Sequence, residues 1–285
     1  MAGARRPGPL GTDTNSGLID PGTCARTHHQ PPGSICATRP SETEIAHRRA
    51  LAEQTHQVRL IIWGGAATPG DNSAFEFSAR NVASDYRAKT KGNFSFVQQH
   101  IKVAKDIVSL INRQPQDSIR SLDIFTHGGP QALYLTTADA DSNQILRYVL
   151  HNSSLYRSRT RMYFNAAGWT EGSALIGDID FARFTMNAKI ELHGCATAAA
   201  DSDTDNIAAD FSVRLVQAGK RNTVVIGHAD KANPNIKGGG EKNSEQDYRH
   251  GRRIVFHNGR ILRATNQRGL ISETELEGLV PGTRP

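Results

Sequence analysis

The chain has 285 residues, with 34 lysines and arginines against 28 aspartates and glutamates, a formal net charge of +6. This length suits one ordinary domain with extensions or two small domains, and so mild a charge favours a basic protein without nucleic-acid or lipid partners. No stretch approaches the roughly 20 apolar residues of a membrane helix, and no apolar segment follows the basic N-terminus. We therefore expect a cytoplasmic protein, or one exported without a classical signal peptide.

Residues 1–55 are rich in proline, glycine, serine and threonine and lack apolar periodicity, which predicts a flexible N-terminal extension. The spacing of its cysteines and histidines matches no standard zinc pattern, so we expect no metal there. Three scattered cysteines also argue against a disulfide framework. The four candidate zinc ligands considered are Cys24, His28, His29 and Cys36.

From residue 56 onward, buried-strand patterns alternate with helical patterns. Turn residues and capping residues set the boundaries between these patterns. The predicted elements are a strand at 58–63, a turn at 69–72, a helix at 74–89, a strand at 94–97, a helix at 101–112 and a strand at 119–126.

The second half of the chain continues the alternation. Asn258-Gly259, the best hairpin turn in the chain, joins its last two strands. The pattern predicts an α/β fold with a mostly parallel sheet covered on both faces, spanning residues 56–265 and followed by a tail at 266–285. Its predicted elements are an extended piece at 132–135, helices at 142–150, 178–186 and 206–219, strands at 189–194 and 222–227, a polar excursion at 229–250 and a hairpin at 253–262.

Two predicted strands end at residues that can carry chemistry. One ends at His127-Gly128, and a later one ends at Gly194-Cys195, which holds the only cysteine beyond residue 36. Sites in parallel sheets form beyond the carboxyl ends of strands, so both residues are expected at one edge. A thiol nucleophile beside an imidazole base is a constellation suited to acyl transfer.

Three further residues compete for roles at this site. His193 lies two residues before Cys195, so its imidazole would flank the thiol, and we assign it a supporting or packing role at the substrate pocket. His228 ends the next strand and is expected to form a wall of the site. Asp123 lies inside its strand and is a poor orienter for His127, so no acidic third member is evident.

At these two motifs the chain resembles the caspase-like cysteine peptidases, the group of caspases, metacaspases, gingipains and toxin self-processing domains. Their shared mark is an apolar strand ending in His-Gly and a later one ending in Ala/Gly-Cys, here 122–128 and 190–195. The order of elements between residues 58 and 262 resembles the group as well. The resemblance implies a three-layer αβα sandwich, with Cys195 as nucleophile, His127 as general base and acid, and the N–H groups of Gly128 and Cys195 as oxyanion hole, without a metal.

The chain departs from the family pattern in two respects. The separation between His127 and Cys195 is longer than in the compact members. The acid that metacaspases carry just before the cysteine is replaced by His193 and Gly194. Some members select basic residues with an acid after the next strand, and Asp230 is a weak candidate for that role.

The polar excursion at 229–250 carries a cluster of basic residues. The self-processing toxin domains use a basic flap in a similar place to bind inositol hexakisphosphate, which the resemblance implies as an allosteric activator here; a solvated charged loop is the simpler interpretation. The basic residues are Lys231, Lys237, Lys242, Arg249, Arg252 and Arg253.

The sequence therefore predicts a cysteine endopeptidase acting on a protein or peptide. It would cleave itself in the linker at 151–177 or release its N-terminal segment. Two alternatives stay open. One is a catalytically inactive caspase-like fold that serves as an interaction module. The other is a Cys–His amidase or acyltransferase with a non-peptide substrate.

Overall fold

The computed structural model describes residues 41, 43, 56–65, 69–89, 92, 94–136, 152–158, 169–199, 204–237 and 242–281. Apart from residues 41 and 43, the predicted N-terminal extension with its cysteines and histidines lies outside the described residues. The helix predicted at 142–150 lies outside them too, as do residues 151 and 159–168 of the linker predicted at 151–177.

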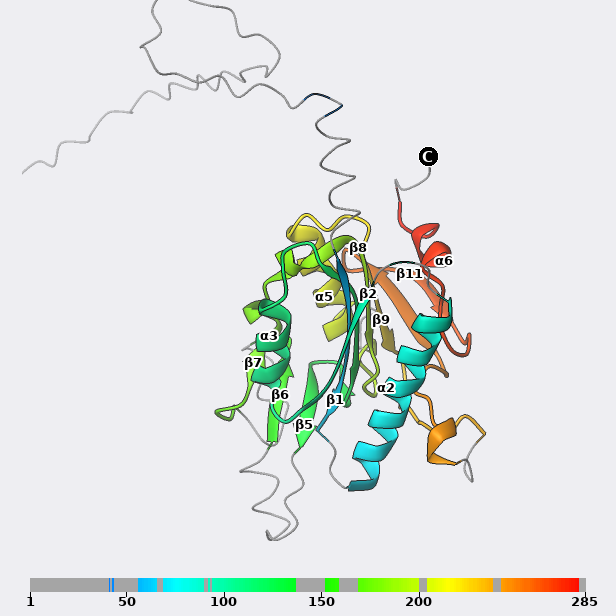
Figure 1. The fold of residues 1–285 in the computed structure, drawn as a ribbon. Helices are drawn as coiled ribbons and strands as arrows, with labels where there is room; N and C mark the ends of the chain where they lie inside the picture. Colours follow the sequence, from blue (N-terminus) through cyan, green and yellow to red (C-terminus); the bar gives the residue numbers. More distant parts are fainter. Residues whose placement is uncertain are drawn as a thin grey trace, which may run out of the picture. The chain divides into compact units, whose positions relative to one another are not determined.

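A seven-stranded, mostly parallel sheet forms the centre of the domain (Figure 1). The last-but-one strand runs antiparallel to both of its neighbours. The fold class predicted from the alternating pattern is thus confirmed. In spatial order the strands are β2 (Phe94–Ile101), β1 (Gln57–Gly64), β3 (Ile119–Phe125), β8 (Phe184–Leu192), β9 (Val224–His228), β10 (Arg253–His257) and β11 (Arg260–Thr265).

Helices cover both faces of this sheet and create three layers. The long helix α2 (Pro69–Lys89) packs on one face, while α3 (Ala104–Asn112) and α5 (Ile207–Gln217) pack on the other (Figure 1). Alternate residues of a strand point to opposite faces. In β1, accordingly, Leu60 and Ile62 join the core under α3 and α5, whereas Ile61 joins the core under α2.

Local sequence signals explain where the helices begin. The Asn206 side chain accepts a hydrogen bond from the Ala209 amide (2.9 Å) and caps α5, close to the predicted start of this helix. The predicted turn at 69–72 is wrong, because α2 already begins at Pro69. Proline fits the first turn of a helix, where its missing N–H has no partner to lose.

A second, four-stranded sheet follows the end of β3. It consists of β4 (His127–Gly129), β5 (Ala132–Thr136), β6 (Asn152–Tyr156) and β7 (Ala174–Leu175). The extended piece predicted at 132–135 is β5, but its pairing partners were not predicted. This small sheet makes His127 the first residue of a new strand rather than the last of an old one.

The helix predicted at 178–186 is wrong. Two single 3₁₀ turns, η2 (Ile176–Asp178) and η3 (Phe181–Arg183), occupy this stretch, and β8 already begins at Phe184. Pairing of Phe184 with Ile119 of β3 draws this residue into the sheet, and such a long-range contact overrides the local pattern.

Within the segment predicted as a C-terminal tail at 266–285, part of the described residues 266–281 packs on the domain. Ile271, Leu276 and Val280 are buried against the sheet beside the short helix α6 (Glu273–Glu277). Just before this segment, Asn258 and Gly259 both adopt positive φ angles, 48° and 72°, and form the predicted hairpin turn between β10 and β11.

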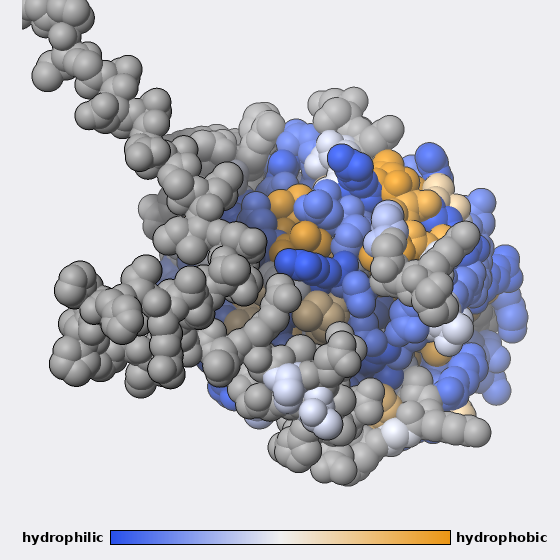
Figure 2. All heavy atoms as spheres, turned by 90° about the horizontal axis from the view of Figure 1, so that it is seen from above, coloured by the Kyte–Doolittle hydropathy of each residue, from blue (hydrophilic) through white to orange (hydrophobic). Residues whose placement is uncertain are grey.

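The surface is mainly hydrophilic in the view of Figure 2, with small separate apolar patches. Scattered apolar residues of this kind are normal on protein surfaces. Within the described ranges, no helix combines the length and apolar character that crossing a membrane requires.

Candidate active site

His127 and Cys195 follow neighbouring parallel strands at the same edge of the sheet. Ile124 of β3 lies opposite Leu192 of β8, and the His193 amide donates to the Ile124 carbonyl (2.8 Å), which extends the ladder past the end of β8. His127 comes two residues after β3 ends, and Cys195 three residues after β8 ends. The structure thus places the two predicted residues on adjacent strand ends.

Two glycines bring these strand ends into backbone contact. A Cβ added to Gly194 would lie 3.0 Å from the Cα atom and 3.1 Å from the amide nitrogen of Gly128. A Cβ added to Gly128 would lie 3.0 Å from the Gly194 Cα atom and 3.1 Å from the Cys195 carbonyl oxygen. A side chain at either position would force neighbouring atoms to shift, so glycine suits so close an approach. The corner containing His127 therefore touches the corner containing Cys195.

Both candidate side chains meet the same apolar wall beneath α2. The His127 imidazole lies edge-on to the Phe75 ring, with ring centres 5.3 Å apart. Cys195 packs against the cluster that contains Phe75, Phe125 and Tyr248. Phe75 comes from α2 and Phe125 from the last position of β3, so the helix and the sheet together form this wall.

The loop after Cys195 is strained and firmly held. Ala196 has a φ of 55°, a left-handed conformation that a residue with a Cβ adopts at a cost. Its amide donates to the Asp230 carbonyl (2.9 Å), and the Ala198 amide donates to the His228 carbonyl (2.8 Å). Asp230, the weak candidate for selecting basic residues, makes this contact through its backbone, and its side chain is exposed.

The Cys195 thiol is covered by the segment that follows β9. Its Sγ atom donates to the Ala232 carbonyl oxygen at 3.6 Å, and Cys195 is half-buried. Tyr248, from the far end of the same excursion, is buried against Phe75 and Phe125. The excursion predicted as a solvated loop therefore packs over the site at these points.

His193 and His228, which were predicted at the substrate pocket, do not line an open pocket; the supporting or packing role predicted for His193 is compatible with this placement. Both side chains are buried. The His193 ring stacks on Phe125, with ring centres 4.0 Å apart and planes inclined by 5°, and its Nε2 lies 3.1 Å from an oxygen of Asp123. Asp123 was expected not to orient His127. Its contact with His193 agrees with that expectation.

Burial of His228 has a consequence for stability in acid. Burial, reinforced by His193, lowers its pKa from 6.5 to about 3. Between these values the unfolded chain binds a proton that the folded chain does not, so stability falls as the pH drops below 6.5, by at most about 1.4 kcal/mol per pH unit from this group. We expect His228→Gln to flatten the stability curve between pH 6.5 and 4. Urea unfolding across this range measures the effect, and equal slopes for the two proteins would contradict it.

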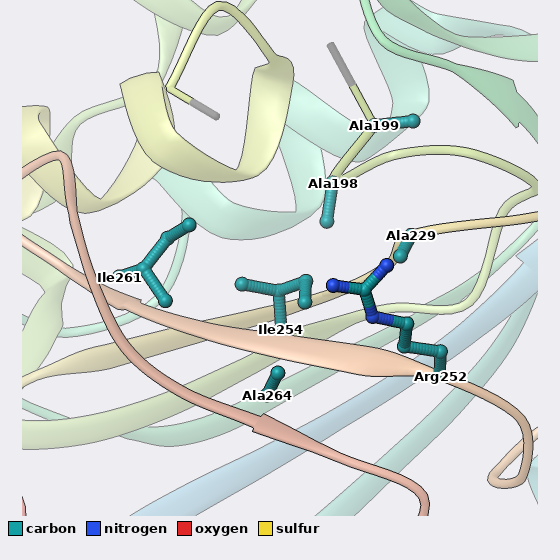
Figure 3. Close-up of a pocket in the computed structure, with 7 residues that line it drawn as sticks. All are labelled: Ala198, Ala199, Ala229, Arg252, Ile254, Ile261 and Ala264. Carbon is teal, nitrogen blue, oxygen red and sulfur yellow. The ribbon is translucent and has the colours of Figure 1, made fainter. Parts of the chain in front are cut away.

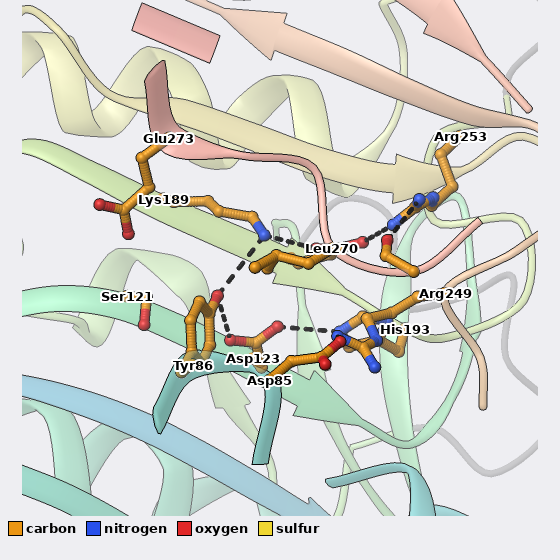
Figure 4. Close-up of polar contacts among 12 residues, drawn as sticks. Asp85, Tyr86, Ser121, Asp123, Lys189, His193, Arg249, Arg253, Leu270 and Glu273 are labelled. Atoms are coloured by element: carbon orange, nitrogen blue, oxygen red, sulfur yellow. Dashed lines mark hydrogen bonds and ion pairs between the residues drawn. The ribbon is translucent and has the colours of Figure 1, made fainter. Parts of the chain in front are cut away.

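A buried polar layer between α2 and the sheet was not predicted (Figure 4). The Tyr86 hydroxyl donates to Asp123 (3.1 Å), the Lys189 ammonium lies 3.1 Å from a Glu191 oxygen, and Arg253 pairs with the other Glu191 oxygen. All five side chains are almost fully buried. The signal in the sequence is alternation: residues 121 and 123 in β3, residues 189 and 191 in β8, and residue 193 just after β8 are polar and point to one face.

Within this layer the buried cations Lys189 and Arg253 are paired with the buried carboxylate of Glu191. Burial alone would raise the pKa of Glu191, but Lys189 and Arg253 hold it well below its usual value. Burial would likewise lower the pKa of Lys189, but Tyr86 and the neighbouring carboxylates raise it. These groups therefore stay ionised and paired at neutral pH.

The same layer contains the one cluster of potential metal ligands found within the described residues. The ligand atoms of Asp123, Glu191 and His193 lie within 4.8 Å of one another. However, Glu191 already pairs with Lys189 and Arg253, and His193 with Asp123. Two adjacent cations would repel a metal ion, so the arrangement fits an internal ion-pair network better.

A small pocket lies beside the loop that follows Cys195 (Figure 3). Its volume is about 260 Å³, and neither His127 nor Cys195 is among the described residues that line it. Figure 3 shows apolar side chains around the Arg252 guanidinium. The pocket is thus a neighbour of the candidate site. The residues lining it are Ala198, Ala199, Ala229, Arg252, Ile254, Ile261 and Ala264.

The basic residues of the excursion do not form one surface. Arg249 is buried against Asp85 and Asp247, and Arg253 is buried against Glu191. Two of the six side chains considered for polyphosphate binding are therefore occupied in the interior. Lys231, Lys237, Lys242 and Arg252 are exposed.

Comparisons of the chain with protein-family models, with curated proteins and with solved structures found no match.

Proposed function

We propose that this chain is a caspase-like cysteine peptidase that hydrolyses peptide bonds, with Cys195 as nucleophile and His127 as general base and acid. The carrying observation is the contact between Gly128 and Gly194 at the ends of neighbouring parallel strands, which joins the two corners. The order of elements, with the histidine strand beside the cysteine strand, supports the family resemblance. A peptide or protein is the proposed substrate, in the cytoplasm or after export.

The proposed reaction needs only groups of these two corners. His127 takes the thiol proton, and the sulfur attacks the substrate carbonyl carbon. The carbonyl oxygen gains the negative charge, which the N–H groups of Gly128 and Cys195 would stabilise. His127 then protonates the leaving amine, and a thioester forms on Cys195. Water, deprotonated by His127, hydrolyses the thioester and restores the thiol.

Substrate access requires movement of the excursion after β9. The Ala232 carbonyl oxygen accepts a hydrogen bond from the Cys195 thiol. A substrate carbonyl would need the space above this sulfur. We therefore propose that residues 229–232 move away before the reaction. If the excursion never opens, the same contact would keep every substrate away from the thiol. The chain would then fit the second candidate function, an inactive fold that serves as an interaction module.

The intact mass of the wild type beside Cys195→Ala tests this proposal. We expect the wild type to lose a fragment by cleavage within residues 151–177 or after the N-terminal extension, and Cys195→Ala to keep the full mass. Both proteins are also incubated with a peptide library.

Each outcome decides between the candidates. Activity that is unchanged in Cys195→Ala would refute the peptidase. A silent library and an intact wild-type mass would favour the interaction module. A silent library together with rapid iodoacetamide labelling of Cys195 would favour an acyltransferase or amidase with a non-peptide substrate.

A further inference from the structure

His193 is attached to β3 by three separate contacts, although it follows β8. Its amide donates to the Ile124 carbonyl (2.8 Å), its ring stacks on Phe125 (4.0 Å), and its Nε2 lies 3.1 Å from Asp123. The residue is fully buried. The backbone and the side chain of His193 are therefore both fixed relative to the strand that leads to His127.

The residues on either side of His193 make this attachment relevant to the site. Gly194 follows directly and contacts Gly128, and Cys195 follows next. A rotation of the His193 backbone would move the thiol relative to the His127 corner. We propose that His193, held by Asp123, is a positioning residue that fixes the Cys195 corner against the His127 corner. This inference rests on the proposed Cys195–His127 pair.

Packing alone does not require an imidazole at this position. The His193 Nδ1 atom is buried without a hydrogen-bond partner, and a buried polar group in that state costs about 1–3 kcal/mol. A phenylalanine would stack on Phe125 without this cost. The imidazole adds a directional bond to Asp123. This bond fixes the rotation of the ring and thereby the position of the His193 backbone.

The test measures how strongly His127 acts on Cys195, with and without the His193–Asp123 bond. Iodoacetamide labelling of Cys195 is followed at pH 6.5 by mass spectrometry of its peptide, with Cys24 and Cys36 quantified in the same digest as references. The His127→Ala effect is measured in the wild type and in His193→Phe, which keeps a ring on Phe125 but loses the bond. Thermal unfolding checks that each protein is folded, and Asp123→Asn replaces His193→Phe if that variant does not fold.

We expect His127→Ala to lower the labelling rate of Cys195 about tenfold in the wild type and less than twofold in His193→Phe. Tyr86→Phe is the matched control, since it removes the other hydrogen bond of Asp123 (3.1 Å) at similar depth, and the tenfold effect should persist in it. A tenfold effect in His193→Phe would overturn the positioning role while leaving the Cys195–His127 pair intact. No effect of His127→Ala in the wild type would refute the pair and this inference together.

Discussion

Replacing His127 with alanine is expected to lower peptide turnover by about 10²- to 10⁴-fold, the usual contribution of general acid–base catalysis. The physical reason is that His127 has two tasks, accepting the thiol proton and protonating the leaving amine. Both tasks belong to the transition state, so kcat should fall while KM changes little. Steady-state kinetics on the best peptide of the library measures the two constants separately. Cys195→Ala removes the nucleophile and should abolish turnover.

His257 provides the matched control for this experiment. It is a half-buried histidine at the end of β10, whose antiparallel direction places it at the opposite edge of the sheet from His127. Its Nδ1 contacts the Thr223 carbonyl oxygen (2.9 Å). His257→Ala should keep kcat within about twofold of the wild type, because only a group near the reacting atoms contributes general acid–base catalysis. Equal losses for the two histidine variants would show that the His127 effect is structural.

Local patterns were sufficient to predict the frame of the candidate site. Apolar runs that end at His127 and at Gly194 marked two strand ends, and the rule for parallel sheets placed both at one edge. The structure adds that these strands are direct neighbours in the sheet. No local pattern specifies which strands pair, because pairing depends on contacts between residues far apart in the chain.

Long-range contacts also explain what the sequence analysis missed. The Arg59 guanidinium reaches Glu273 (2.8 Å) across more than two hundred residues, and this ion pair helps to attach the segment that was predicted as a tail. The position of Asp123 inside its strand indicates no role beside His127, and the structure shows that its carboxylate contacts His193. A polar residue in an apolar strand indicates that a partner exists, but it does not identify that partner.

Removing the buried carboxylate of Glu191 is expected to cause the largest loss of stability. Glu191→Gln would leave the fully buried Arg253 and the nearly buried Lys189 without their shared carboxylate. Removing one partner of a buried ion pair costs about 3–5 kcal/mol, because the remaining charge is neither paired nor hydrated. Urea unfolding should show this loss in the free energy of unfolding, and thermal unfolding should show a Tm lower by roughly 10 °C.

Glu76→Gln tests whether burial, rather than charge alone, causes this loss. Glu76 pairs with Arg80 one turn later on the exposed side of α2, and such surface pairs contribute less than about 1 kcal/mol. Adding Arg253→Met to Glu191→Gln should recover part of the stability, since the second change removes the charge that the first one left unpaired. If Glu191→Gln cost no more than Glu76→Gln, the polar layer would have to be hydrated in solution, and the argument that Lys189 and Arg253 exclude a metal ion would weaken with it.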